Sequence, residues 1–431
     1  MRIAFTGVRV PGHLNPMTTL ARRLKARGHD VVFLSVVDAE PLVRAAKLPF
    51  IPYCEKEFPA GSTRERLNQL SKLQGQAALE FTIASLAENL DASFRNLPRT
   101  LREVQADALV HDEVEIRLGL VPMKLGMPYA TVSNAMHCDY SGNTPLCIFD
   151  WPHETTPEAL VRNLEGARGL ERSLEPARSV GRAYAEQAGL DIDWTDPFAT
   201  ISKLAWLTQT PKEFDFKSSH WLPYFHHTGP FHDGTGRIES NFPWERLTGE
   251  PLIYASMGTL QNGLETVFST IAEAVGERPG MQPVLSIGPA LDPGQIKNLP
   301  AGAIVVKSAP QVELLKRSAL CITHAGLNTT LESLTQGVPM VAIPVTNDQP
   351  GVAARIAYTK TGGVLPLKEM TAPRLRSLID EVLNNAEYRQ NASRMKQAIA
   401  ETNGLEKAVD VLEQAFKLHG QVKQKLAFAE G

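Results

Sequence analysis

Short apolar runs alternate with helix-like segments along this chain of 431 residues, and this alternation limits its fold more than any other feature. Near the N-terminus, residues 3–5 form an apolar run, residues 17–24 carry apolar side chains at helical spacing, and residues 31–34 form a second run. Gly28 stands where the cap of the intervening helix belongs. Strands joined by amphipathic helices predict an α/β fold with a parallel, doubly wound sheet.

The alternation starts afresh after a segment rich in glycine and proline. That segment, residues 229–250, has little apolar periodicity and is interpreted as a linker. Further apolar runs cover residues 108–110, 129–132, 252–256, 284–286, 304–306, 320–323 and 341–343, and a helical pattern starts at Thr371. We therefore expect an N-terminal domain over residues 1–228, a C-terminal domain over residues 251–405 and a final helix with a tail over residues 406–431.

Composition excludes several classes of protein. Lys and Arg total 44 and Asp and Glu total 47, so the formal charge is −3, without the basic excess of a nucleic-acid binder. The four cysteines form no CxxC pair, which argues against a disulfide scaffold or a structural zinc site and favours a reducing cytoplasm. We expect no signal peptide and no apolar run long enough to span a membrane. Peripheral contact with a membrane surface is an alternative that the sequence leaves undecided.

The segment from Ser308 to Gln349 carries the strongest chemical signal. His324 stands at the carboxyl end of the predicted strand 320–323, and Gly326, Asn328 and Thr329 open the next helix. A helix N-terminus has unpaired N–H groups and a partial positive charge, so it binds phosphate. Glu332, one turn further, is placed to accept hydrogen bonds from a ribose. The same residues also suit a tight strand–helix turn that binds nothing.

The full ordered set resembles the donor-binding signature of family 1 glycosyltransferases, which use nucleotide sugars and have the GT-B fold. Its elements are Ala309-Pro310-Gln311, His324-x-Gly-x-Asn-Thr-x-x-Glu332, Gly337-Val338-Pro339 and Asp348-Gln349. Ser308 and Leu327 replace two tryptophans of the plant pattern, and the first of these stacks on uracil. Residues 255–261 and 348–356 look like the matching segments of bacterial zeaxanthin glucosyltransferases.

The resemblance implies two Rossmann-like domains with parallel sheets facing across a cleft, and a C-terminal helix that returns to the first domain. It implies a donor site for UDP-glucose, in which Gln311 and the backbone near Ala309 meet the uridine and Glu332 holds the ribose. Asp348 and Gln349 would bind sugar hydroxyls. The remaining donor contacts implied are Thr259, Ser308, His324, Gly326, Asn328 and Thr329.

His13 is the candidate general base. It lies in Pro11-Gly12-His13-Leu14-Asn15-Pro16, between the first strand and the first helix, and faces the carboxyl edge of the sheet. A lone histidine in a loop is usually a surface residue, but the family has its base in such a setting. Asp112, after the strand 108–110, is the candidate partner that orients the imidazole. His111 and Glu113 flank it.

Other candidate residues carry weaker signals. Four residues, any of which could instead be core, are candidates for a lipophilic acceptor pocket: Met136, His137, Phe149 and Trp151. Asp191-Ile192-Asp193 matches a DxD metal motif of another glycosyltransferase fold, but it lies far from any phosphate-binding turn and is interpreted as chance. No metal and no cofactor beyond the donor is expected, because the helix N-terminus and His324 would neutralise the leaving diphosphate.

The expected reaction is an inverting transfer of glucose from UDP-glucose to a hydroxyl of a lipophilic or aromatic small molecule, zeaxanthin-like or phenolic. One alternative is a nucleotide-sugar epimerase, which shares the architecture, although Asp348-Gln349 argues against it. A dinucleotide oxidoreductase would need a G-x-G-x-x-G turn, which Pro11 and a missing glycine spoil. A binding protein that has lost catalysis is a third alternative, disfavoured by intact His13 and Asp112.

Overall fold

The computed structural model describes residues 1–70, 73, 75–218, 220–238, 240–258, 265–276 and 278–429. Its first sheet has seven strands in the order β3-β2-β1-β4-β5-β6-β7, and every pair is parallel. The strands are β1 (Arg2–Thr6), β2 (Asp30–Ser35), β3 (Phe50–Pro52), β4 (Ala108–Asp112), β5 (Tyr129–Ser133), β6 (Trp206–Thr208) and β7 (Phe225–His227). Because all strands run one way, their carboxyl ends share one edge.

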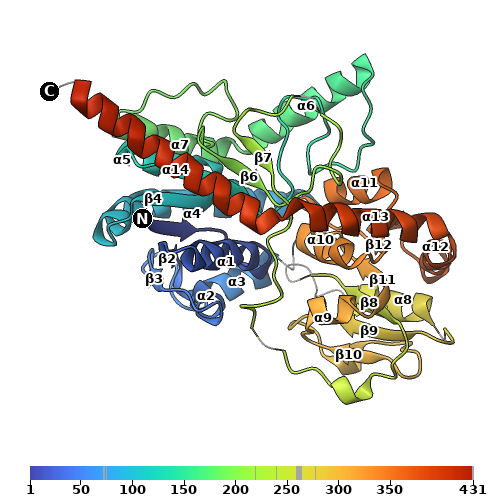
Figure 1. The fold of residues 1–431 in the computed structure, drawn as a ribbon. Helices are drawn as coiled ribbons and strands as arrows, with labels where there is room; N and C mark the ends of the chain where they lie inside the picture. The colour runs from blue at the N-terminus through green and yellow to red at the C-terminus, as the bar shows by residue number, and fades with distance from the viewer. Residues whose placement is uncertain are drawn as a thin grey trace.

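Helices cover both faces of this sheet (Figure 1). One apolar cluster joins Ile3 and Phe5 to α1, and another joins Ala4 and Leu109 to α4 and α7. The helices are α1 (Pro11–Ala26), α2 (Glu40–Ala45), α3 (Ser62–Leu70), α4 (Gly75–Glu103), α5 (Leu120–Leu125), α6 (Pro157–Ser173) and α7 (Glu175–Ala188). Two of these helices, α6 and α7, lie in the long connection between β5 and β6.

The second sheet has six strands, all parallel, in the order β10-β9-β8-β11-β12-β13. They are β8 (Leu252–Ser256), β9 (Gln282–Ser286), β10 (Ile304–Val306), β11 (Ser318–Thr323), β12 (Met340–Ala342) and β13 (Gly362–Val364). Its helices are α8 (Glu265–Val275), α9 (Gln311–Leu315), α10 (Leu327–Gln336), α11 (Gln349–Tyr358), α12 (Ala372–Asn384) and α13 (Ala386–Thr402). Apolar clusters lie on both faces, so each sheet is a doubly wound α/β unit.

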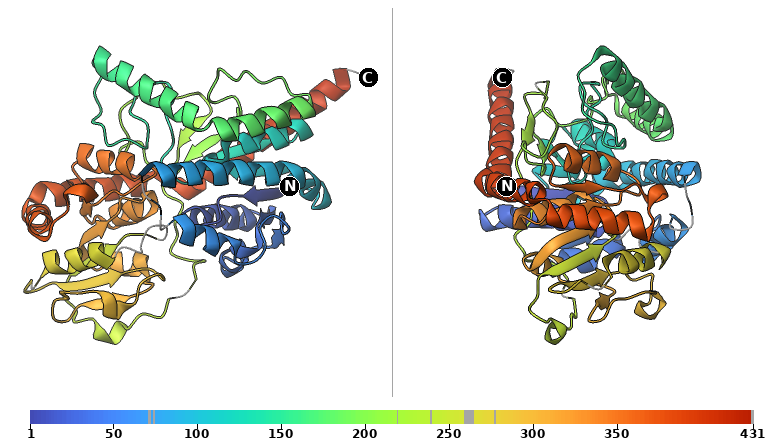
Figure 2. Two further views of the ribbon diagram at one scale, coloured as in Figure 1. Left: turned by 180° about the vertical axis from the view of Figure 1, so that it is seen from behind. Right: turned by 90° about the vertical axis from the view of Figure 1, so that its right-hand side faces the viewer.

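The last helix, α14 (Gly404–Ala429), runs back along the first half of the chain (Figures 1 and 2). Its apolar residues join the cluster that contains Ile3 and Phe5, and its acidic residues pair with the basic end of α1. The His29 Nε2 and Glu413 Oε1 atoms lie 3.0 Å apart. In the described part of the chain, no helix is long and apolar enough to cross a membrane.

Candidate active site

His13 lies in the first turn of α1, because the helix already begins at Pro11. The sequence had placed it in the preceding loop. Proline is tolerated at the first helical position, where its missing N–H would have no partner in any case. Asp112 ends β4, the direct neighbour of β1, so both residues reach the same edge of the sheet. His13 Nδ1 and Asp112 Oδ2 lie 2.7 Å apart.

The Asp112 carboxylate is fully buried and held by two further donors. Asn134 Nδ2 donates to its Oδ2 at 2.6 Å, and the Val114 backbone N–H donates to its Oδ1 at 3.0 Å. Burial alone would raise the pKa of Asp112, but His13 and these hydrogen bonds lower it. Burial alone would lower the pKa of His13, but the Asp112 carboxylate outweighs this and raises it. The carboxylate fixes a proton on Nδ1, which leaves Nε2 to accept one.

A second buried carboxyl lies near this pair. Glu115 is 8% exposed, and burial raises its pKa to about 7, while the nearby Arg9 guanidinium and His13 act in the opposite direction. Arg9 comes from the loop between β1 and α1 and stacks on Phe58, with its guanidinium carbon 4.0 Å from the ring centre. Glu115 therefore acts electrostatically on both His13 and Asp112.

On the second sheet, β11 turns sharply into α10 through His324, Ala325 and Gly326. Ala325 has a φ of 63°, in the left-handed region, and Gly326 caps the helix. A Cβ at Gly326 or at Gly258 would lie 2.5 Å or 2.4 Å from the His324 ring, so both positions need glycine. Burial lowers the pKa of His324 to about 4. The imidazole is therefore neutral at neutral pH, and the positive charge here comes from the helix N-terminus.

Glu332, 3% exposed, lies at the centre of a hydrogen-bond network. Gln311 Nε2 donates to Glu332 Oε2 at 2.7 Å and contacts Thr329 Oγ1 at 3.2 Å. Arg237 donates to the other carboxylate oxygen, Oε1. Burial alone would raise the pKa of Glu332, but Arg237 lowers it, so the carboxylate stays ionised. Ser308 is exposed and Ala309 half-buried just beyond β10, at the same edge.

The predicted sugar-binding pair lies at the start of α11. The Met136 backbone N–H donates to Asp348 Oδ2 at 2.9 Å, which connects this helix to the first half of the chain. Burial raises the pKa of Asp348, and its charge acts on His13. Gln349 Oε1 accepts from the backbone N–H groups of residues 345 and 346 at 2.9 and 3.0 Å. The Gln349 side chain therefore stabilises the loop between β12 and α11.

Asn328, the second residue of α10, joins the two halves. Its Nδ2 donates to the Gly12 carbonyl at 2.5 Å, and its Oδ1 accepts from Gln209 Nε2 at 2.9 Å. Pro16 lacks the N–H that would normally bond to the carbonyl of residue 12, so this carbonyl is free to accept from across the interface. The turn at α10 therefore lies beside the residue that precedes His13.

The four predicted acceptor residues do not form a group. His137 is fully buried with its Nε2 3.0 Å from Asp215 Oδ2, and Met136 is buried in the core between the two halves. This corrects the expectation for both, because neither is open to an incoming molecule. The rings of Phe149 and Trp151 stack with their centres 3.8 Å apart, and both pack against α6 at Gly166. Thr259 lies outside the described residues.

The DxD match has a local role in the part of the chain that the structure describes. Asp193 Oδ1 accepts from the backbone N–H and the hydroxyl of Thr195 at 2.9 and 2.6 Å, which stabilises a turn after α7. No group of three or more metal-ligating side chains occurs among the described residues.

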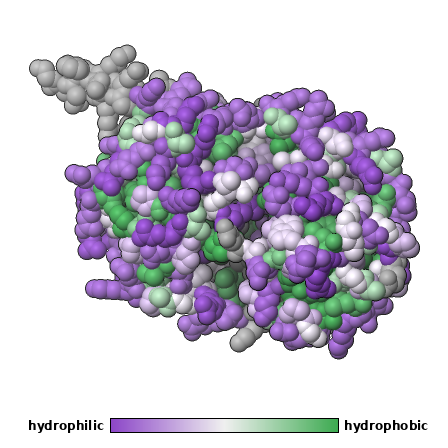
Figure 3. Space-filling model, turned by 60° about the horizontal axis from the view of Figure 1, so that its bottom comes forward, coloured by the Kyte–Doolittle hydropathy of each residue, from purple (hydrophilic) through white to green (hydrophobic). Residues whose placement is uncertain are grey.

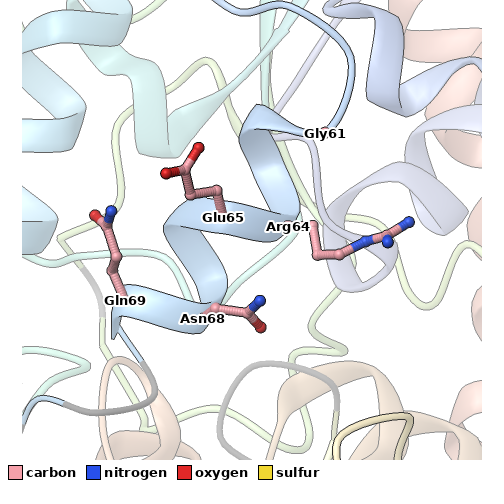
Figure 4. A pocket seen from close by; sticks show the side chains of 5 residues that line it. All are labelled: Gly61, Arg64, Glu65, Asn68 and Gln69. Atoms are coloured by element: carbon pink, nitrogen blue, oxygen red, sulfur yellow. The ribbon is translucent and has the colours of Figure 1, made fainter.

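The surface is hollowed between two lobes, and apolar residues show in that hollow (Figure 3). A separate open hollow of about 500 Å³ lies beside α3. Glu65 and Gln69 project from one side of this helix, and Arg64 and Asn68 from the other (Figure 4). This polar hollow contains none of the predicted site residues.

Sequence reasoning missed three residues of the site. Asn134 follows β5 at the sheet edge that carries Asp112, so the predicted strand 129–132 could have pointed to it. Gln209 follows β6, a strand that the sequence did not predict. Arg237 lies in the connecting segment, where no motif or periodicity marks it.

A sequence model of the UDP-glucoronosyl and UDP-glucosyl transferase family matches residues 184–416, more than half of the chain. The chain belongs to this family. The glycosyltransferase is 27% identical over 409 residues to the zeaxanthin glucosyltransferase of Pantoea ananas, covering 94% of this chain and 93% of that one. It is 26% identical over 417 residues to the demethyllactenocin mycarosyltransferase of Streptomyces fradiae, covering 95% and 86%.

Solved structures of glycosyltransferases share the fold. The kitacinnamycin glycosyltransferase superposes with a TM-score of 0.75 at 22% identity, covering 96% of this chain and 98% of that one. The glycosyltransferase described here thus has the GT-B fold that its sequence predicted, with two parallel sheets. As a member of this family it uses nucleotide-sugar donors and small-molecule acceptors.

Proposed function

We propose that this glycosyltransferase transfers glucose from UDP-glucose, with inversion, to a hydroxyl group of a lipophilic or aromatic small molecule. The observation that carries the proposal is the contact between Asn328 and Gly12. This contact brings the N-terminus of α10 beside the start of α1, which carries His13, so the proposed base and the proposed diphosphate site would share one interface. The resemblance to zeaxanthin glucosyltransferases supports a carotenoid-like acceptor, and a phenol or flavonoid is the second candidate class.

In the proposed reaction, His13 Nε2 takes the proton from the acceptor hydroxyl. The oxygen attacks the anomeric carbon of glucose on the face opposite UDP, the bond to the diphosphate breaks, and UDP leaves with the bonding electrons. The α-linked donor gives a β-glucoside. Asp112 stabilises the imidazolium that forms, since its buried carboxylate is 2.7 Å from Nδ1.

The donor would bind on the second sheet without a metal. The N–H groups that open α10 would receive the diphosphate, beside the neutral ring of His324. The ribose would reach Glu332, the uracil would lie near Gln311, and Asp348 would bind glucose hydroxyls. Membership of a transferase family favours this reaction over epimerisation.

The test is UDP release from UDP-glucose in the presence of EDTA. Separate reactions contain zeaxanthin, a flavonol, a simple phenol or no acceptor, and His13→Ala is the matched inactive variant. Release that depends on an acceptor and on His13 supports the proposal, and the best acceptor identifies the substrate class. Full activity of His13→Ala would refute the role of the base, and a failure of the wild-type chain to bind UDP would refute the donor site.

A further inference from the structure

Arg237 belongs to the segment that connects β7 to β8, yet it reaches into the predicted donor site. Its guanidinium donates to Glu332 Oε1, and its side chain is 30% exposed. Gln311 Nε2 occupies the other carboxylate oxygen, Oε2, at 2.7 Å. Arg237 therefore touches the residue expected to bind the donor's ribose.

These two contacts occupy about half of the hydrogen-bond acceptor positions of the Glu332 carboxylate. An ionised carboxylate offers about four lone-pair positions, two on each oxygen. Arg237 takes one position on Oε1 and Gln311 takes one on Oε2, so within the described part of the chain one position on each oxygen has no donor. Two adjacent hydroxyls, such as the 2′ and 3′ hydroxyls of a ribose, can each donate to a different oxygen.

The connecting segment is anchored to the first half of the chain. Arg22 of α1 donates through Nη2 to both carboxylate oxygens of Asp233, each at 2.8 Å, and through Nη1 to Thr235 Oγ1 at 2.6 Å. Gly236, with a φ of 72°, passes so close that a Cβ would lie 2.8 Å from Arg22 Nε. The segment is thus held by α1 at residues 233 and 235, and two residues later Arg237 contacts Glu332 of α10.

Arg237 also supplies the permanent positive charge beside Glu332 among the described residues. Further titratable groups that interact with this carboxylate are His232 in the same segment, Tyr254 in β8 and Cys321 in β11. Burial lowers the pKa of His232, so its imidazole is neutral at neutral pH. Tyr254 and Cys321 carry no positive charge in any state.

We propose that Arg237 is a positioning residue of the donor site, which orients the Glu332 carboxylate for the two ribose hydroxyls. The inference rests on the proposed function, because it requires a nucleotide in this pocket. It makes the connecting segment part of donor recognition. It also makes the enzyme prefer UDP to dTDP, since a deoxyribose leaves one lone-pair position without a donor.

The experiment measures Kd for UDP and dTDP by calorimetry at about pH 8 and about pH 5.5, around the range in which a carboxyl without a cation would begin to titrate. Arg237→Met should weaken UDP binding about tenfold or more, because hydrogen bonds to charged groups are among the stronger ones. The ratio of variant to wild-type Kd should grow as the pH falls, since Glu332 without Arg237 becomes protonated. The phosphate of UDP titrates equally with both proteins, so its effect cancels in the ratio.

Further variants separate orientation from general damage to the fold. Arg237→Lys should restore part of the UDP affinity and remove the growth of the ratio at low pH. Arg246→Met is the matched control, because Arg246 lies in the same segment and its guanidinium donates to the Ala303 carbonyl, at 3.0 Å, rather than to a carboxylate of the donor site. In turnover, Arg237→Met should raise KM for UDP-glucose much more than it lowers kcat.

Two results would overturn the inference. Equal or tighter UDP binding by Arg237→Met would mean that Arg237 merely fills the site until nucleotide arrives. A Kd ratio that does not change with pH would mean that Arg237 does not govern the charge of Glu332. If Glu332→Gln weakens UDP binding while Arg237→Met does not, this inference fails alone, whereas wild-type protein that binds no UDP refutes the proposed donor site as well.

Discussion

Asp112→Asn tests the catalytic pair, because it keeps the shape of the side chain and removes its charge. The backbone N–H of Val114 cannot turn away, so the new amide oxygen should take the Oδ1 position and accept from it. The NH₂ group then takes the Oδ2 position, where it faces His13 and also Asn134, whose own amide can turn to present its oxygen. Nδ1 then has to accept a hydrogen bond, and the ring proton moves to Nε2. The nitrogen that should take the acceptor's proton is thereby blocked.

The expected loss follows from what a positioned base contributes. General base catalysis is worth about 10²–10⁴-fold in rate, and we expect kcat/KM on the pH plateau to fall by a factor in that range. The Asp112 carboxylate is what raises the pKa of His13, so that pKa should fall in the variant. Activity that needs a neutral imidazole is lost as the pH falls through this pKa. The acidic limb of the pH–rate profile should therefore move to lower pH.

The assay is UDP release with a single acceptor from about pH 5 to about pH 9, which spans the ordinary histidine range. UDP affinity, measured by calorimetry, should not change, because the hydrogen bonds of Asp112 lie within the first half of the chain. A plateau within about threefold of the wild type, or an acidic limb that stays in place, would refute the reasoning.

Three further substitutions test other parts of the structure. Gly326→Ala should displace the His324 ring, because a Cβ would lie 2.5 Å from it, and kcat/KM should fall about 100-fold without a matching loss on Gly169→Ala, whose Cβ has room. Arg355→Met leaves the buried carboxylate of Asp215 without its cation, and the free energy of unfolding in urea should fall by about 3–5 kcal/mol. An unchanged midpoint of the urea unfolding transition would contradict this. Leu412→Ala, on a fully buried position of α14, should lower it by about 2–5 kcal/mol, and a smaller loss would mean that α14 is not part of the core.

The family resemblance singled out His13 as the candidate base, and the rule that parallel strands end at one edge pointed to Asp112 as its partner. His13 and Asp112 are 99 residues apart in the chain, yet β1 and β4 pair directly, with Thr6 opposite His111. The motif from Ser308 to Gln349 likewise follows strand ends of the second sheet. Such positions are visible in sequence because apolar runs mark the strands that carry them.

Other parts of the site had no local signal. Strand β6 is three residues long, too short for a periodic pattern, so Gln209 could not be placed beside it. The contacts of Arg237 and Asn328 depend on how the two sheets meet, which neither propensity nor periodicity encodes. Met136 and His137 proved to be buried, because an aromatic or sulfur-containing side chain suits a core as well as a pocket.

The return of α14 has a consequence for how the molecule forms during synthesis. A ribosome delivers the first sheet early, but the apolar cluster on one of its faces lacks Leu412 and Phe416 until almost the whole chain has emerged. That face would stay open to solvent or to a chaperone while the second sheet can already close, because its own clusters use no residue beyond 399 and one of them lies wholly within residues 253–388. The earliest-made half of this enzyme would thus be the last to acquire its final stability.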